Sequence, residues 1–140
     1  MLLGAPISAG DEPRPRLLHD RRLAQLCFDL CNRYRHGAGL PELRWCERLY
    51  DDCLRRALAM AGRGAPPPPP AHAAENLAVA EQSARQPPAL QVVNGWILSA
   101  PHRSRLEGAF ARGAVAVVRS ERPARYFFAQ LAAPEAGAQQ

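Results

Sequence analysis

Two short stretches decide the fold of this chain: Glu75-Asn76-Leu77-Ala78, and Trp96-Ile97-Leu98-Ser99-Ala100-Pro101-His102-Arg103. The first supplies a carboxylate and an amide, and the second supplies an indole and an imidazole. A compact domain can bring these four groups to one cleft, although neither stretch is informative alone. Their order along the chain therefore sets both the expected fold and the expected site.

The composition predicts one globular domain. With 140 residues, 47% hydrophobic and 22% charged, the chain can bury a single core. The net charge of +5 comes from arginine, because the sequence has no lysine. Basic residues cluster only near the N-terminus, at Arg14, Arg16, His19, Arg21 and Arg22. A solvent-exposed start of the first helix explains this cluster better than a surface that binds nucleic acid or anionic lipid, because such a surface would gather basic residues on one face.

The ends of the chain are expected to lie outside the domain. We predict a flexible leader over 1–19, a domain over 20–133 and a disordered tail over 134–140. No apolar run approaches the ~18 residues that a membrane span needs. Residues 1–10 are apolar but have no positively charged start, so they do not form a clear signal peptide.

The remaining pattern places helices first and strands last, which predicts an α+β domain. Asp20 is a candidate N-cap for the first helix. Residues 66–70 are five consecutive prolines and predict a stiff surface spacer. The expected helices span 20–35, 47–61 and 89–99; the expected strands span 114–118 and 126–132, joined by a turn at 120–125; and 74–81 stays undecided between helix and strand.

Further motifs accompany the two opening stretches. Asn32 and Arg33 precede Gly39-Leu40-Pro41-Glu42-Leu43-Arg44-Trp45, and Phe127-Phe128-Ala129-Gln130 lies in the last expected strand. In this order, the motifs resemble those of the CAP superfamily, which contains the cysteine-rich secretory proteins, antigen-five allergens and plant pathogenesis-related proteins. The match is to the pattern of bacterial members, and it covers roughly residues 23–133.

This resemblance implies a three-layer α-β-α sandwich with a central antiparallel sheet. It also implies a cleft of histidine and acidic residues, which in some relatives holds a divalent metal. Most relatives are secreted binding or signalling modules, and some bind lipids or sterols. An extracellular or periplasmic protein with a lipid-like, sterol-like or protein ligand is therefore expected.

The sequence departs from the family pattern at several cleft positions. The histidine usual upstream of Glu75 is missing, and the proline spacer occupies that region. His72 is the only nearby substitute. Phe128 and Ala129 stand where animal and plant relatives have histidine and threonine, and Pro101 replaces a glycine. The cleft is therefore expected to be partly degenerate.

The candidate cleft residues support two interpretations. We expect a binding cleft without committed catalytic residues, in which Glu75 and His102 form a structural hydrogen-bonded pair; the cleft set is Glu75, Asn76, Trp96, Ser99, His102 and Gln130. The alternative is a metal-assisted hydrolase that uses Glu75 and His102, with zinc held by His72, Glu75 and His102. A third possibility, a basic nucleic-acid or anionic-surface binder, rests on charge alone. No cofactor is the primary expectation.

The four cysteines leave their redox state open. If the first two helices pack antiparallel, Cys31 can meet Cys46 and Cys27 can meet Cys53. The helical rise separates the first-helix pair by about 6 Å and the second pair by about 10.5 Å, so two unstrained disulfides do not fit. One disulfide and four buried thiols are equally expected.

Overall fold

The computed structural model describes residues 16–82, 85–121 and 124–136, and their strands form one sheet. β1 (Leu17–His19), β4 (Arg112–Glu121), β5 (Ala124–Ala133) and β3 (Ala74–Glu81) pair antiparallel in the order β1-β4-β5-β3. The short β2 (Arg44–Trp45) pairs parallel with β4. In the long central hairpin, β4 alternates alanine and valine over residues 114–117 and β5 is rich in aromatic and small apolar residues, and both strands are buried on both faces of the sheet.

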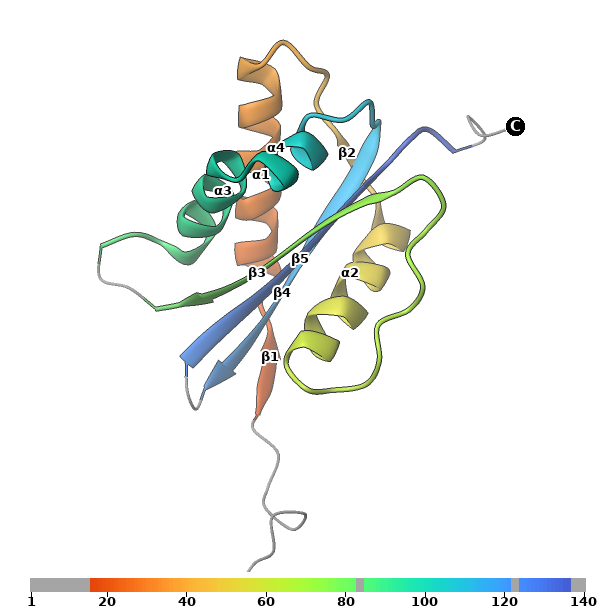
Figure 1. Cartoon of the computed structure of the whole chain (residues 1–140). Helices are drawn as coiled ribbons and strands as arrows, with labels where there is room; N and C mark the ends of the chain where they lie inside the picture. The colour runs from red at the N-terminus through yellow and green to blue at the C-terminus, as the bar shows by residue number, and fades with distance from the viewer. Residues whose placement is uncertain (1–15, 83–84, 122–123, 137–140) are drawn as a thin grey trace, which may run out of the picture.

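Helices cover both faces of this sheet (Figure 1). On one side lie α1 (Arg21–Gly37), α3 (Pro88–Leu98) and α4 (Ala100–Leu106), and on the other lies α2 (Glu47–Met60). Successive β4 residues point to opposite faces, so Val115 and Val117 pack with α1 and α3, whereas Ala114 and Ala116 pack with α2. The expected α-β-α sandwich with an antiparallel sheet is confirmed.

The domain extends beyond the expected bounds at both ends. Leu17 to His19, predicted as leader, form β1 and pair with Val118 to Ser120. Asp20 is the N-cap of α1, because its Oδ1 accepts a hydrogen bond from the N–H of Leu23 at 3.0 Å. The segment predicted as tail begins with ordered contacts, since Glu135 pairs with Arg44. The rest of the predicted leader and tail, 1–15 and 137–140, lies outside the described residues.

Three elements were not predicted, and each has a local cause. β1 and β2 are only three and two residues long, too short for a periodic pattern. α4 follows α3 directly after Ser99, so the helix expected over 89–99 is one of two consecutive helices. The undecided segment 74–81 is strand β3. Pro123, placed in the expected turn, lies outside the described residues.

A buried arginine ties the α1 side of the molecule together. Arg35 is 1% exposed, and its guanidinium donates hydrogen bonds to the carbonyls of Pro41, Leu106, Gly108 and Phe110 at 2.8–3.3 Å. Burial lowers the pKa of this guanidinium. The four carbonyls belong to the loop after α1 and to the end of α4 with the loop that follows, so one side chain fixes α4 against α1.

In the described residues, no helix is both long enough and apolar enough to cross a membrane.

Candidate functional site

The two opening stretches meet at Asn76, which is 1% exposed in β3. Its Nδ2 donates to Oε1 of Gln130 on β5 at 3.0 Å and to the backbone carbonyl of His102 on α4 at 3.2 Å. Nearby, Nε1 of Trp96 donates to the carbonyl of Leu77 at 3.1 Å. These bonds hold α3 and α4 on one face of β3. Asn76, Gln130 and Trp96 thus act first as structural links.

The side chain of Glu75 points to the opposite face of β3 from that of Asn76. Its neighbour Asn76 faces α4, so strand alternation directs the Glu75 side chain to the opposite face. There its Oε2 forms an ion pair with Nε of Arg56, a side chain of α2 that is 3% exposed. The carboxylate is therefore already neutralised by a buried cation.

The imidazole of His102 has a different partner. Its Nδ1 lies 2.8 Å from Oγ of Ser99, at the junction of α3 and α4. Within the described chain, no hydrogen bond joins this ring to Glu75. The expected Glu75–His102 pair is therefore wrong: the two motifs do meet, but through the backbone of His102 and the amide of Asn76.

The expected zinc ligands do not form a metal centre. His72 is exposed in the turn before β3, with a left-handed backbone (φ 61°), and Glu75 is engaged by Arg56. Among the described residues, no three or more His, Cys, Asp or Glu side chains are grouped so that they could hold a metal ion. A cation beside Glu75 would also be repelled by Arg56. The residues present do not fit zinc.

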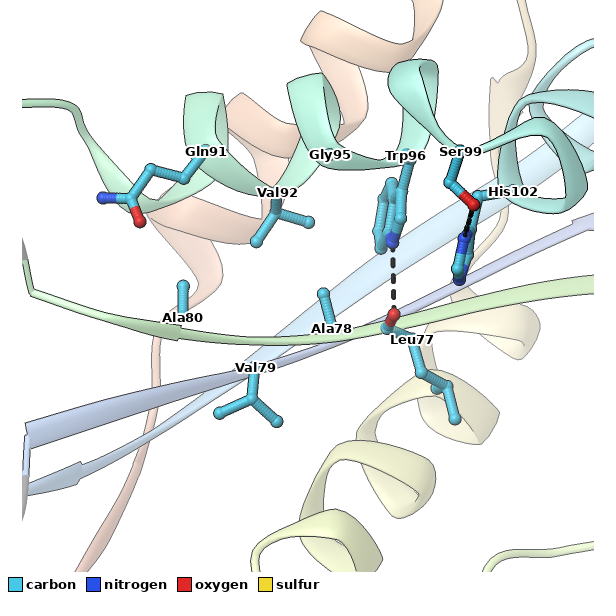
Figure 2. A pocket seen from close by; sticks show the side chains of 10 residues that line it. All are labelled: Leu77, Ala78, Val79, Ala80, Gln91, Val92, Gly95, Trp96, Ser99 and His102. Atoms are coloured by element: carbon cyan, nitrogen blue, oxygen red, sulfur yellow. Dashed lines mark hydrogen bonds between the residues drawn. The ribbon is translucent and has the colours of Figure 1, made fainter.

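Two hollows border the meeting point. The first, of about 380 Å³, is a groove between β3 and α3 (Figure 2). Residues 77–80 form its strand side, Gln91, Val92, Gly95 and Trp96 form its helix side, and Ser99 and His102 close one end. The second, of about 510 Å³, lies beside Glu75 and is bounded by Pro69, Ala73 and Arg105. Leu77 and His102 border both hollows. The sequence predicted the residues at the groove's end and Trp96 of its helix wall, but not the rest of its walls.

Comparison with known proteins gives the family. The model of the cysteine-rich secretory protein family, CAP, matches residues 28–131. The chain belongs to the CAP family. A solved extracellular protein of Bacillus anthracis that contains an SCP domain is similar over 83% of this chain and 41% of its own length, with 21% identity and a TM-score of 0.60. The CAP chain therefore spans less than half of that protein.

An outer surface protein of Borrelia burgdorferi has the same fold. It is similar over 86% of this CAP chain and 99% of its own, with 12% identity and a TM-score of 0.66. At these identities both structures support the fold alone. No curated protein sequence matches the chain significantly.

The cysteines of this CAP domain are all free thiols, so both disulfide candidates are wrong. Cys27 and Cys31 lie in the core between α1 and the sheet, whereas Cys53 lies in the core between α2 and the sheet. The antiparallel helix pair assumed from the sequence does not exist, because the sheet separates the two helices. Burial raises the pKa of Cys27 and of Cys53, which keeps these thiols protonated.

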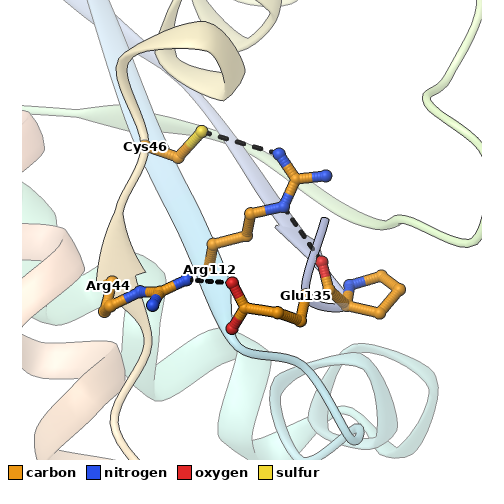
Figure 3. A network of polar contacts seen from close by, with 5 residues as sticks. Arg44, Cys46, Arg112 and Glu135 are labelled. Carbon is orange, nitrogen blue, oxygen red and sulfur yellow. Dashed lines mark hydrogen bonds and ion pairs between the residues drawn. The ribbon is translucent and has the colours of Figure 1, made fainter. Parts of the chain in front are cut away.

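Cys46 has a different environment, at the N-cap of α2 (Figure 3). Burial alone would raise its pKa, but the N–H of Leu49, the Arg112 guanidinium and the N–H of Arg48 outweigh this effect and lower the pKa. Nη1 of Arg112 lies 3.7 Å from Sγ, and its Nε donates to the carbonyl of Pro134. In contrast to Cys27 and Cys53, this half-buried thiol has an environment that favours the thiolate.

We expect iodoacetamide to alkylate Cys46 selectively in the native protein at pH 7, because the other three thiols are fully buried. Mass spectrometry of tryptic peptides reads the site. An Arg112→Gln variant should be labelled more slowly at Cys46, since it loses the cation beside Sγ. Native labelling of Cys27 or Cys53 at a comparable rate would contradict the burial described here.

Proposed function

We propose that this CAP domain is a binding module whose ligand occupies the groove between β3 and α3. The observation that carries this proposal is the groove itself, which stays open in a domain whose other motif residues are engaged in internal bonds. Its walls are mainly apolar, and the Ser99–His102 pair offers polar groups at one end. Such a combination is typical of ligand sites.

The contacts of Glu75 favour binding over the alternative of hydrolysis. A general base must reach the proton that it removes, and the Glu75 carboxylate is instead held by Arg56. The imidazole of His102 borders the same hollow as Glu75, but its Nδ1 is hydrogen-bonded to Ser99 and not to the carboxylate. The charge-based alternative also loses support, because Arg21 of the N-terminal cluster contacts Glu47 and Tyr50. Arg14 of that cluster lies outside the described residues.

We also propose an extracellular location for the module. The family is named for secreted proteins, and the two similar structures are described as an extracellular protein and an outer surface protein. This location would suit a domain that binds through an open surface groove.

Gly95→Leu is the sharpest test of the groove. A Cβ at Gly95 meets no atom within 4 Å, so a larger side chain can extend into the groove without displacing the core. We offer three probes to the immobilised protein: palmitate, cholesterol sulfate and a hexapeptide library displayed on phage. At least one should bind the wild type and lose most of its affinity for Gly95→Leu.

Gly37→Leu is the matched control, because Gly37 is equally open but lies at the end of α1, away from the groove. It should keep wild-type binding. A bound probe at 100 times its Kd should add about 2.7 kcal/mol to the free energy of unfolding. If no probe binds, or if Gly95→Leu binds as well as Gly37→Leu, the groove is not the site.

A further inference from the structure

We infer that the ligand of the groove is an extended peptide that adds a strand to the outer edge of β3. This inference rests on the proposed function and names the class of ligand. It follows from three features of β3: the direction of its backbone groups, the exposure of its side chains and the charges near its ends.

The backbone of β3 leaves hydrogen-bonding groups directed away from the sheet. β3 is the last strand in the order β1-β4-β5-β3, so only one of its edges pairs with β5. The carbonyl of Leu77 is bonded to Trp96, which shows that residue 77 directs its backbone groups outward. In an antiparallel pair this direction alternates, so Val79 also directs its N–H and C=O outward. Another backbone is the natural partner for such groups.

The side chains beside this edge offer apolar surface on both faces of the strand. Leu77 and Val79 are 36% and 54% exposed, on the face where α2 packs on β4 and β5. The groove against α3 lies on the other face. A peptide strand presents alternate side chains to the two faces and can use both surfaces together. The side chains of Leu77 and Val79 point away from α3 (Figure 2), so a lipid chain in the groove would reach the backbone of these residues but leave their side chains exposed.

Charge favours a peptide over a second copy or an anionic lipid at one end of the exposed row. Glu75 is bound by the buried Arg56, whereas Glu81 is 75% exposed and forms only a loose pair with Arg125 at 3.8 Å. If a second copy paired antiparallel about Ala78, Glu75 of one chain would face Glu81 of the other, so neither carboxylate would gain a cation. The Glu81 carboxylate also repels an anionic lipid headgroup. A peptide with apolar residues in the middle and Arg or Lys opposite Glu81 is complementary.

The test distinguishes the contribution of the outward N–H of Val79 to peptide binding from that of its side chain. Val79→Pro removes this N–H, and proline is tolerated where the N–H of an edge strand faces solvent. Val79→Thr keeps both the N–H and the branched shape. Hexapeptides selected on the wild type should bind Val79→Thr normally and bind Val79→Pro at least about tenfold more weakly. Circular dichroism and the urea midpoint check that both variants fold.

A second measurement does not depend on how Val79→Pro folds. The same peptides, N-methylated at alternate residues, should lose wild-type binding in only one of the two methylation patterns, because alternate N–H groups face β3. The inference is overturned if Val79→Pro binds within about threefold of wild type, or if both methylation patterns bind unchanged. If only palmitate or cholesterol sulfate binds and Gly95→Leu blocks it, the proposed function stands and the peptide inference fails. If no probe binds, both fail.

Discussion

Replacing Arg35 by methionine is expected to lower the free energy of unfolding by at least about 3 kcal/mol. Methionine fills similar space but donates no hydrogen bond. The carbonyl of Gly108 would keep the N–H of Phe110, but the other three carbonyls would lose the guanidinium, and each buried acceptor left without a donor costs about 1–3 kcal/mol. The expected value allows for partial rescue by water. Urea unfolding followed by circular dichroism measures the change through the midpoint and slope.

Two other variants make this result specific to Arg35. Arg33→Met changes an exposed arginine on the same helix and should shift stability by no more than about 0.5 kcal/mol. Arg35→Lys should recover little, because a single ammonium cannot copy the fork geometry that serves separate carbonyls. A loss below about 1 kcal/mol in Arg35→Met would mean that the four bonds do not hold α4 in place.

The second large effect is expected at the Arg56–Glu75 ion pair. Glu75→Gln would leave the Arg56 guanidinium buried without its counter-charge. Breaking a fully buried pair costs about 3–5 kcal/mol, and the part-exposed Glu75 lowers the expected loss to about 2 kcal/mol. Unfolding in urea at pH 7 gives the value.

Removing the unpaired charge of Arg56 should restore part of the stability that Glu75→Gln loses. In the double variant Arg56→Met with Glu75→Gln, no buried cation remains, so its stability should exceed that of Glu75→Gln alone. Glu107→Gln is a matched control, since it weakens the exposed pair with Arg103 at 3.8 Å and should cost under about 0.5 kcal/mol. If Glu75→Gln is no worse than Glu107→Gln, the ion pair does not matter for stability.

The sequence predicted the layers better than it predicted the site. Apolar runs and turn residues located α1, α2, α3, β4 and β5, and the ordered motifs pointed to the CAP fold. The site prediction failed mainly because segment 74–81 was undecided between helix and strand. In a strand, alternation places the side chains of Glu75 and Asn76 on opposite faces. With that segment assigned as a strand, the two neighbours would have been placed on opposite faces.

The partners of the motif residues could not be predicted, because they depend on packing between elements. No spacing in the sequence links Arg56 to Glu75 or Arg35 to four carbonyls. The disulfide hypothesis failed for a similar reason. It assumed that two consecutive helices pack together, whereas the sheet lies between them and separates Cys27 from Cys53.

Glu75 and His102 belong to two separate structural networks, and we propose that ligand binding occurs in the groove. A double-mutant cycle of Glu75→Gln and His102→Ala, measured by urea unfolding, tests whether the two networks are independent. His102→Ala removes the ring next to Ser99 but keeps the backbone carbonyl that Asn76 uses. We predict that the two losses add within about 0.5 kcal/mol, whereas a coupling energy above about 1 kcal/mol would show that the two side chains act as a pair.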